Sequence, residues 1–269
     1  MLTAAGSRYS GAVNSAIVLA GGLSSRMGRP KALLPWRGMT MIEHVVGVLR
    51  SVVTDVIVVT SAELDLPALD ATLVRDRAPK LGPLAGIREG LEAMRGDLAF
   101  VTSTDAPFLT AAFVKAMLAF GTTAAAEVDG FVQSMSAVYA KPLAATANDL
   151  IATSRMRPLF LLEAAKFRRV APSELVDLDS MKSLNAPDDY LDALRRDRQT
   201  GPATVEFLGT ARMKFGVSRD VPPGPLGGVL RDIGEHHLIS LNGKQFVRDA
   251  HIPVGPGDRV IVMDAAAGG

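Results

Sequence analysis

The stretch Ala16-Ile-Val-Leu-Ala-Gly-Gly-Leu-Ser-Ser-Arg-Met-Gly-Arg-Pro-Lys31 decides the fold of the amino-terminal part of the chain. Its first five residues are apolar and include two β-branched side chains, which is typical of a buried strand. The glycines and polar residues that follow predict a loop at the carboxyl end of that strand, where open α/β sheets bind their ligands. The stretch therefore predicts a ligand-binding loop after a central strand.

Further apolar runs and helical patterns alternate along the next hundred residues. Runs like the first recur at 56–60 and 98–102, and helix-periodic stretches lie at 41–52, 84–94 and 110–120. This alternation predicts βαβ units and a mostly parallel sheet that is covered by helices on both faces. We therefore expect a three-layer, Rossmann-like α/β domain.

The pattern changes after a last predicted helix at 187–196. The charged and turn-forming residues 198–202 predict a linker, and the short strands that follow surround an Asn242-Gly243 turn and end in a strand at 259–263. A short helix is expected at 228–233. We therefore expect a flexible tail at 1–14, an α/β domain at 15–197 and a small α+β domain at 203–269.

Composition excludes several classes of protein. The chain has 269 residues, a formal net charge of +1 and no cysteine. Without cysteine there are no disulfides, thiolate metal sites or cysteine nucleophiles. No basic stripe interleaved with aromatic residues indicates a nucleic-acid partner. No apolar run approaches the roughly 18 residues that span a bilayer, and the first 15 residues do not resemble a signal peptide, so a cytoplasmic location is expected.

The loop after the first strand has the chemistry of a phosphate site. Gly21 and Gly22 allow the backbone to approach a ligand closely, and successive N–H groups there can bind phosphate oxygens. Arg26 and Lys31 add positive charge for a triphosphate and for a departing pyrophosphate. The loop matches neither the Gly-x-Gly-x-x-Gly pattern nor the P-loop pattern.

Asp105 is the candidate metal ligand. It follows the apolar run 98–102 within Ser103-Thr-Asp-Ala-Pro-Phe108, so it is expected at the carboxyl end of a central strand. A carboxylate at that position suits Mg²⁺, which is usually shared between one or two carboxylates and substrate phosphates. The alternatives are an Asp–Pro turn or an N-cap for the helix that begins near Thr110.

The string from Leu19 to Gly28 resembles the signature of the nucleotidyltransferases related to MobA, the molybdenum cofactor guanylyltransferases. Gly82-Pro-Leu-Ala-Gly-Ile87, preceded by Asp76, is similar to the family segment that borders the base and ribose pocket. The resemblance covers residues 15–197. The nucleotide-binding residues that it implies are Leu19, Ala20, Gly21, Gly22, Arg26, Lys31, Asp76, Gly82, Pro83 and Leu84.

Two later segments resemble the family's acceptor region. The segment 128–139 is similar to a hairpin that faces the pterin-bearing acceptor, which makes Gln133 a candidate contact, although Ser134-Met135 replaces the usual Pro-Leu. Ser183-Leu-Asn-Ala-Pro-Asp-Asp189 is similar to a late family motif. Asn185 would position substrate or metal there, or would be the N-cap of the last helix.

The resemblance implies that a terminal phosphate of molybdopterin attacks the α-phosphorus of a nucleoside triphosphate and expels pyrophosphate. Arg26, Lys31 and Asp105 with Mg²⁺ would carry the catalysis by positioning and charge neutralisation. Gly21-Gly22 favours GTP, whereas Pro30-Lys31 is closer to cytidylyl relatives and leaves CTP open. A sugar-phosphate or isoprenoid-phosphate nucleotidyltransferase is the alternative enzyme, but sugar enzymes usually have Gly-Thr-Arg-Leu in place of Ser-Ser-Arg-Met.

The carboxyl-terminal region resembles the ubiquitin-like β-grasp sulfur carriers MoaD and ThiS, through its turns and its final Gly268-Gly269. The resemblance implies a thiocarboxylate at Gly269 that supplies sulfur to molybdopterin synthesis. The implied partners are a ubiquitin-activating-like adenylyltransferase and the large subunit of molybdopterin synthase. A thiamine-type carrier stays open because Ala-Ala-Ala precedes Gly-Gly, and a non-catalytic carrier or interaction protein is the remaining alternative.

Overall fold

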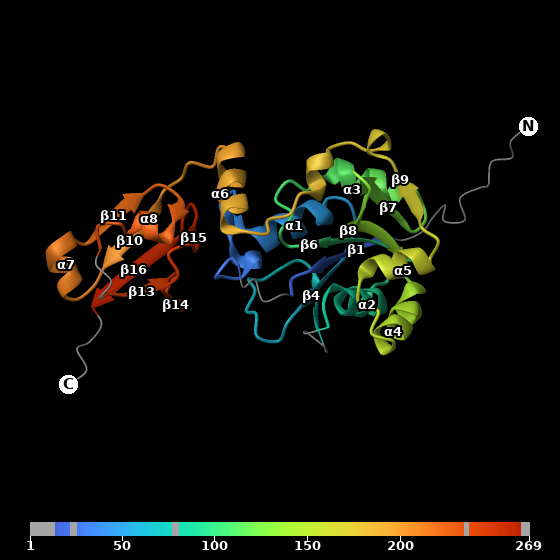
Figure 1. Cartoon of the computed structure of the whole chain (residues 1–269), viewed down its shortest axis with the longest axis horizontal. Helices are drawn as coiled ribbons and strands as arrows, with labels where there is room; N and C mark the ends of the chain where they lie inside the picture. Colours follow the sequence, from blue (N-terminus) through green and yellow to red (C-terminus); the bar gives the residue numbers. More distant parts are fainter. Residues whose placement is uncertain (1–13, 22–25, 77–80, 234–236, 265–269) are drawn as a thin grey trace, which may run out of the picture. The chain divides into compact units, whose positions relative to one another are not determined.

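The computed structural model describes residues 14–21, 26–76, 81–233 and 237–264. By their internal contacts these residues form two compact units (Figure 1). The first unit comprises 1–22 and 42–183, and the second comprises 23–41 and 184–269. The second unit therefore includes the segment after the phosphate loop, whereas the boundaries expected at 197 and 203 stay a prediction. Within the described ranges, no helix is long and apolar enough to cross a membrane.

The described residues of the first unit form a seven-stranded sheet of order β5-β4-β1-β6-β8-β7-β9. The strands are β1 (Asn14–Leu19), β4 (Asp55–Thr60), β5 (Thr72–Arg75), β6 (Leu98–Ser103), β7 (Ala124–Val128), β8 (Phe131–Ala140) and β9 (Arg168–Val170). β5, β4, β1 and β6 are parallel, and β8 is antiparallel to β6. The expected mostly parallel sheet is therefore confirmed, with a β7–β8 hairpin at Asp129-Gly130 beside it.

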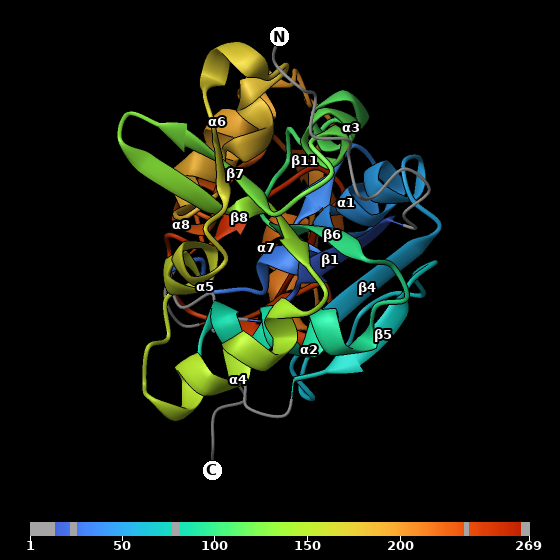
Figure 2. The ribbon, with the colours of Figure 1, turned by 90° about the vertical axis from the view of Figure 1, so that its right-hand side faces the viewer.

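Helices lie on both faces of this sheet. They are α1 (Met41–Arg50), α2 (Pro83–Ala93), α3 (Ala111–Ala119), α4 (Leu143–Ala152) and α5 (Pro158–Ala164), with short 3-10 turns η2 (Pro172–Glu174) and η3 (Leu178–Met181). Figure 2 shows α2, α4 and α5 on one face of the sheet and α1 and α3 on the other. Because both faces are covered, β1 and β4 are buried along their length without polar alternation.

One hydrophobic core of the first unit lies between the sheet and the α2–α4–α5 face. Ile17, Leu91 and Tyr139 are each fully buried within it. Gly90 allows α2 to approach β1, because a Cβ at that position would lie 2.5 Å from Ile17 Cγ2. This close approach fixes α2 against the central strand.

The described residues of the second unit include a separate five-stranded sheet of order β11-β10-β16-β13-β14. Its strands are β10 (Ala203–Phe207), β11 (Ser218–Val221), β13 (His237–Leu241), β14 (Gln245–Val247) and β16 (Arg259–Asp264). The parallel pair β10 and β16 lies at its centre, and the other pairs are antiparallel. Alternate residues of β10, Ala203, Val205 and Phe207, point into a small apolar core.

Further short elements complete the second unit. They are η1 (Lys31–Leu33), β2 (Pro35–Trp36), β3 (Met39–Thr40), α6 (Pro187–Arg196), α7 (Thr210–Phe215), β12 (Gly224–Pro225), α8 (Leu226–Val229) and β15 (Pro253–Val254). α8 overlaps the helix expected at 228–233 only at 228–229, since it begins directly after Pro225 and ends at Val229. α7 was not expected, since most of its residues are exposed and carry no apolar periodicity.

Candidate active site

The carboxyl ends of three strands in the first unit meet at one edge of its sheet. Ala20 and Gly21 follow β1, and the Ala20 N–H donates to Val59 O in β4 at 2.7 Å. On the other side of β1, the Thr104 N–H donates to Leu19 O at 3.3 Å. The start of the glycine loop therefore lies next to the segment that carries Asp105, as strand order predicts. Gly22 lies outside the described residues.

Asp105 lies in the turn that follows β6 and is 8% exposed. The Ser103 hydroxyl donates a hydrogen bond to its Oδ1 atom. The expected alternative of an N-cap is wrong, because Thr110 caps α3 by accepting from Phe113 N at 3.2 Å. No group of three or more His, Cys, Asp or Glu side chains converges as a metal site in the described ranges.

The expected base and ribose segment lies at the same edge of the sheet. Asp76 follows β5, and its N–H donates to Thr60 O at the end of β4 at 2.9 Å. Gly82 has a φ of +76°, which favours glycine, and Pro83 begins α2 behind it. The Leu84 side chain is fully buried in the core, so a ligand contact there would involve its backbone.

Arg26 and Lys31 belong to the second unit. Arg26 is exposed in a turn, and Lys31 is partly buried as the first residue of η1. η1 leads into the β2–β3 hairpin, in which Trp36 is fully buried. The Trp36 side chain therefore packs in the interior.

The two expected acceptor residues lie in different units. Gln133 lies in β8 of the first unit, and its Nε2 donates to Phe131 O at 3.2 Å. Asn185 precedes α6 in the second unit. The expected alternative that it caps this helix is wrong, because the N-cap is Ala186 and the Asp189 carboxylate accepts from the N–H groups of Asn185 and Ala186 at 2.7 and 2.9 Å.

Three further polar residues with notable contacts were not predicted as functional residues. Ser103 contacts Asp105, and its place at the end of an apolar strand beside an aspartate is a signal that could have found it. Arg29 and Asp258 form a buried ion pair in the second unit. Arg29 lies two residues before Lys31, and Asp258 ends the tight turn Gly255-Pro-Gly-Asp258, in which its N–H donates to Gly255 O at 3.1 Å.

The chain matches the description "MobA-like NTP transferase domain" over residues 16–168. A relative from Mycobacterium tuberculosis, "Probable molybdenum cofactor guanylyltransferase", is 34% identical over 183 residues, which are 64% of this chain and 91% of the relative. The protein of the same name from Mycobacterium ulcerans is 33% identical over 193 residues, 67% of this chain and 96% of that protein.

Solved structures agree on the fold. "Molybdopterin-guanine dinucleotide biosynthesis protein A" from Archaeoglobus fulgidus superposes with a TM-score of 0.59 at 21% identity, over 69% of this chain and 99% of that one. A 2-C-methyl-D-erythritol 4-phosphate cytidylyltransferase from Thermus thermophilus gives 0.54 at 18% identity, over 68% and 98%. Together with the matched sequence family, these likenesses show that the chain belongs to the MobA-like NTP transferase domain family and is an enzyme of the nucleotidyltransferase kind.

Proposed function

We propose that this enzyme transfers GMP from GTP to the terminal phosphate of molybdopterin and releases pyrophosphate. The observation that carries the proposal is the edge of the first unit's sheet, where Asp105 follows β6 and lies beside the glycine loop after β1. The names of the relatives, which are 33–34% identical to this chain, support the acceptor and the nucleotide. CTP as the nucleotide and a sugar or isoprenoid phosphate as the acceptor are the alternatives.

The proposed reaction is a single displacement at phosphorus. An oxygen of the acceptor's terminal phosphate forms a bond to the α-phosphorus of GTP, and the bond from that phosphorus to the bridging oxygen breaks, so both electrons leave with pyrophosphate. The protein needs no nucleophile, because binding and orientation of the two phosphates supply most of the catalysis.

The residues of the site have separate proposed roles. Backbone N–H groups of the Gly21-Gly22 loop bind phosphate oxygens, while Arg26 and Lys31 hold the β- and γ-phosphates that leave. Asp76 and the Gly82-Pro83 segment border the base and ribose. Gln133 and Asn185 are proposed to contact the acceptor.

The carboxylate of Asp105 fits a magnesium ion. Its oxygens are of the kind that Mg²⁺ prefers, it lies in the turn directly after β6, and the Ser103 hydroxyl that donates to Oδ1 orients it. When bound, Mg²⁺ would neutralise charge on the triphosphate and on the leaving pyrophosphate. The role of Asp105 is to hold the ion and to set the position of the phosphates next to the glycine loop.

Pyrophosphate release tests this proposal. Purified full-length enzyme is supplied with Mg²⁺, molybdopterin and either GTP or CTP. Faster release with GTP supports the guanylyl transfer, and faster release with CTP overturns only the choice of nucleotide. No release with either nucleotide, from folded protein and a competent acceptor, contradicts the proposed reaction.

A second proposed function concerns the carboxyl-terminal sheet. Its two central strands, β10 and β16, are parallel and are the first and last strands of that sheet in the chain. A mixed sheet of this kind supports the β-grasp sulfur carrier that the sequence resemblance implies. Gly268 and Gly269, which lie outside the described residues, would carry sulfur as a thiocarboxylate for molybdopterin synthesis or, alternatively, for thiamine synthesis.

Intact mass measurement tests the carrier function. The chain is incubated with ATP, a sulfur donor and a ubiquitin-activating-like adenylyltransferase, and the mass gained when sulfur replaces one oxygen is sought. Loading that disappears in Gly269→Ala supports a carrier, and transfer to the large subunit of molybdopterin synthase would name its destination. A chain that is never loaded, or that loads equally well as Gly269→Ala, contradicts the carrier function.

A further inference from the structure

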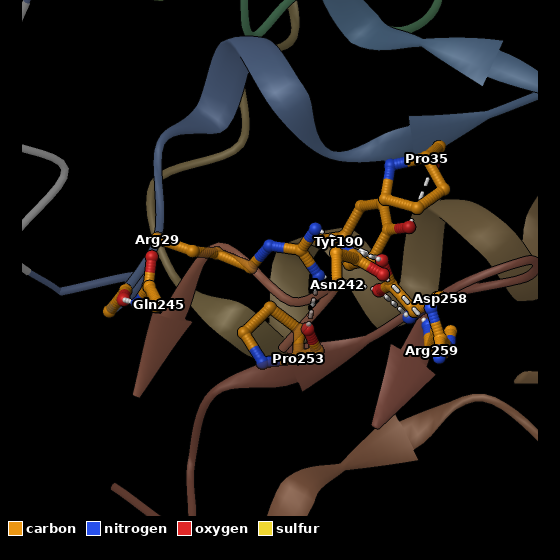
Figure 3. Close-up of polar contacts among 10 residues, drawn as sticks. Arg29, Pro35, Tyr190, Asn242, Gln245, Pro253, Asp258 and Arg259 are labelled. Carbon is orange, nitrogen blue, oxygen red and sulfur yellow. Dashed lines mark hydrogen bonds and ion pairs between the residues drawn. The ribbon is translucent and has the colours of Figure 1, made fainter. Parts of the chain in front are cut away.

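A buried ion pair ties the segment after the phosphate loop to the carboxyl-terminal sheet (Figure 3). Arg29 Nη1 lies 2.5 Å from Asp258 Oδ2, and Arg29 Nη2 lies 3.1 Å from Oδ1. The two side chains are only 5% and 1% exposed. The paired geometry uses both oxygens of the carboxylate, which fixes the orientation of the guanidinium as well as its distance.

The charges of this pair are well compensated. Asp258 also accepts from Asn242 Nδ2 and from the Gly255 N–H, each at 2.8 Å. Arg29 Nη1 donates in addition to Pro253 O at 3.2 Å. A buried pair is tolerated only when further hydrogen bonds offset the loss of water, and removal of one partner leaves an uncompensated charge. The Arg29 guanidinium is therefore bound by acceptors of the carboxyl-terminal region, the Asp258 carboxylate and Pro253 O.

Other contacts hold the same segment on both sides of Lys31. Before it, Gln245 Nε2 donates to Gly28 O at 2.9 Å. After it, the Tyr190 hydroxyl donates to Pro35 O at 2.7 Å (Figure 3). Burial and the negative charge of Asp258 raise the pKa of Tyr190, so this hydroxyl stays a donor near neutral pH.

The backbone at Gly28 is packed too closely for any other residue. Its φ is +63°, and a Cβ there would lie 2.4 Å from Ile252 Cγ1. Ile252 belongs to the core of the carboxyl-terminal domain. The chain from Gly28 to Pro35 is thus fixed by side chains that come from residues beyond 189.

We propose that the carboxyl-terminal domain is a positioning element of the nucleotidyltransferase, in which Asp258 acts through Arg29 to hold Lys31 for the triphosphate. The inference rests on the proposed function, because Lys31 is the residue that would meet the leaving phosphates. Arg29 and Asp258 are not proposed to contact substrate. They are positioning residues, and their loss acts by allowing the Lys31 segment to move.

The size of the effect follows from the geometry of catalysis. A catalytic group that is displaced by about 1 Å can lower the rate by about 100-fold. Asp258→Asn keeps the shape of the side chain but removes the charge that binds Arg29, so we expect kcat/KM for GTP to fall by roughly 10- to 100-fold. The double variant Arg29→Gln with Asp258→Asn removes both charges and should recover part of that loss.

The experiment measures pyrophosphate release and backbone hydrogen exchange on the same full-length variants. In Asp258→Asn, exchange should increase in the peptide that covers 26–41 while β10 and β16 keep their protection. Asp232→Asn is the matched control, because its carboxylate pairs with Arg219 within the same domain and contacts no part of 26–41 among the described residues. That control should leave both readouts unchanged.

If Asp258→Asn loses protection from hydrogen exchange throughout the carboxyl-terminal domain, two further variants test whether the segment 26–41 is held in place. Tyr190→Phe and Gln245→Ala each remove one neutral hydrogen bond, and together they should lower kcat/KM several-fold with β10 and β16 intact. The proposal is overturned if exchange at 26–41 stays the same in all variants, or increases with no change in kcat/KM. Wild-type enzyme that releases no pyrophosphate would instead refute the proposed function, and the positioning role with it.

Discussion

Arg29 and Asp258 lie 229 positions apart in the sequence and form a two-point ion pair that is almost fully buried. The pair joins the segment after the phosphate loop to a turn of the carboxyl-terminal sheet. Residues 23–41 and 184–269 therefore form one compact unit. The region whose sequence resembles a carrier therefore also contacts the segment that contains Lys31, on both sides of that residue.

A substitution at Gly255 tests the packing of Tyr190, whose hydroxyl binds Pro35 O. A Cβ at position 255 would lie 2.0 Å from the Tyr190 hydroxyl oxygen, which donates to Pro35 O. Gly255→Ala should therefore lower the free energy of unfolding by about 1–3 kcal/mol, as overpacking does. The measurement is urea denaturation.

A double-mutant cycle separates this clash from a general effect of alanine. Tyr190→Phe removes the hydroxyl, so the double variant should lose less stability than the sum of the two single variants. Strictly additive losses would show that the two residues do not contact one another in solution.

Gly90 tests the packing that positions the site in the first unit. A Cβ at this position would lie 2.5 Å from Ile17 Cγ2, so Gly90→Ala should push α2 away from β1 and destabilise the fold by about 1–3 kcal/mol. Gly47→Ala is the matched control, because Gly47 is an exposed residue of α1 and nothing lies within 4 Å of its added Cβ.

The control should change stability in the opposite direction. Alanine in an exposed helix is favoured over glycine by about 1 kcal/mol. Thermal unfolding should therefore shift down for Gly90→Ala and up for Gly47→Ala. Equal shifts of the same sign would contradict the close packing of α2 on β1.

Asp55 gives a prediction for pH. Burial of its carboxyl opposes ionisation, but hydrogen bonds from the Ser15 hydroxyl at 2.5 Å and from the Arg95 N–H at 2.8 Å outweigh it and hold the pKa of Asp55 below its usual value. A carboxyl whose pKa is lowered on folding stabilises the fold above its unfolded pKa of 3.8, and this stabilisation is lost as pH falls through the folded value.

Asp55→Asn removes the ionisable group and should destabilise the protein at pH 7 by about 2 kcal/mol, since hydrogen bonds to a charged group are lost. The difference from wild type should shrink as the pH falls below about 4. Urea denaturation between pH 7 and pH 3 measures both points. A difference that is constant with pH would show that the charge of Asp55 contributes nothing to stability.

The parts of the fold that follow local patterns could be predicted from sequence. The apolar runs at 56–60 and 98–102 lie in β4 and β6, as expected for strands whose two faces are both covered by helices. The position of Asp105 beside the start of the glycine loop follows from the same reasoning, since parallel strands end at one edge. The helical pattern at 84–94 likewise matches α2, which begins at Pro83 directly after Gly82.

Other features depend on contacts that no local pattern encodes. Asp258 occurs in a Gly-Pro-Gly-Asp turn, and an aspartate is an ordinary residue in such a turn. Its ion pair with Arg29 joins residues 229 positions apart, so the sequence does not indicate it. Asn185 has the residue type of an N-cap, yet the cap is Ala186, because Asp189 accepts from both backbone N–H groups. α7 carries no apolar stripe, and its Ala211 is the residue that is buried.

Lys31 tests the phosphate-binding role of the segment. Lys31→Ala should lower kcat/KM for GTP on the order of 100-fold, because a positive charge that binds the departing pyrophosphate is lost. Lys115→Ala is the control, since Lys115 is an exposed residue of α3. Steady-state pyrophosphate release measures both variants, and an unchanged rate in Lys31→Ala would remove this residue from the site.

The edge of the sheet that carries Asp105 is proposed to perform Mg²⁺-dependent nucleotidyl transfer. The most direct measurement is pyrophosphate release from GTP with molybdopterin, comparing wild type with Asp105→Ala and with Asp65→Asn, an exposed loop carboxylate in the same unit. We expect pyrophosphate release by wild type and by Asp65→Asn, and a rate that is lower by about 100-fold or more in folded Asp105→Ala. Release that persists undiminished in Asp105→Ala would contradict the proposal.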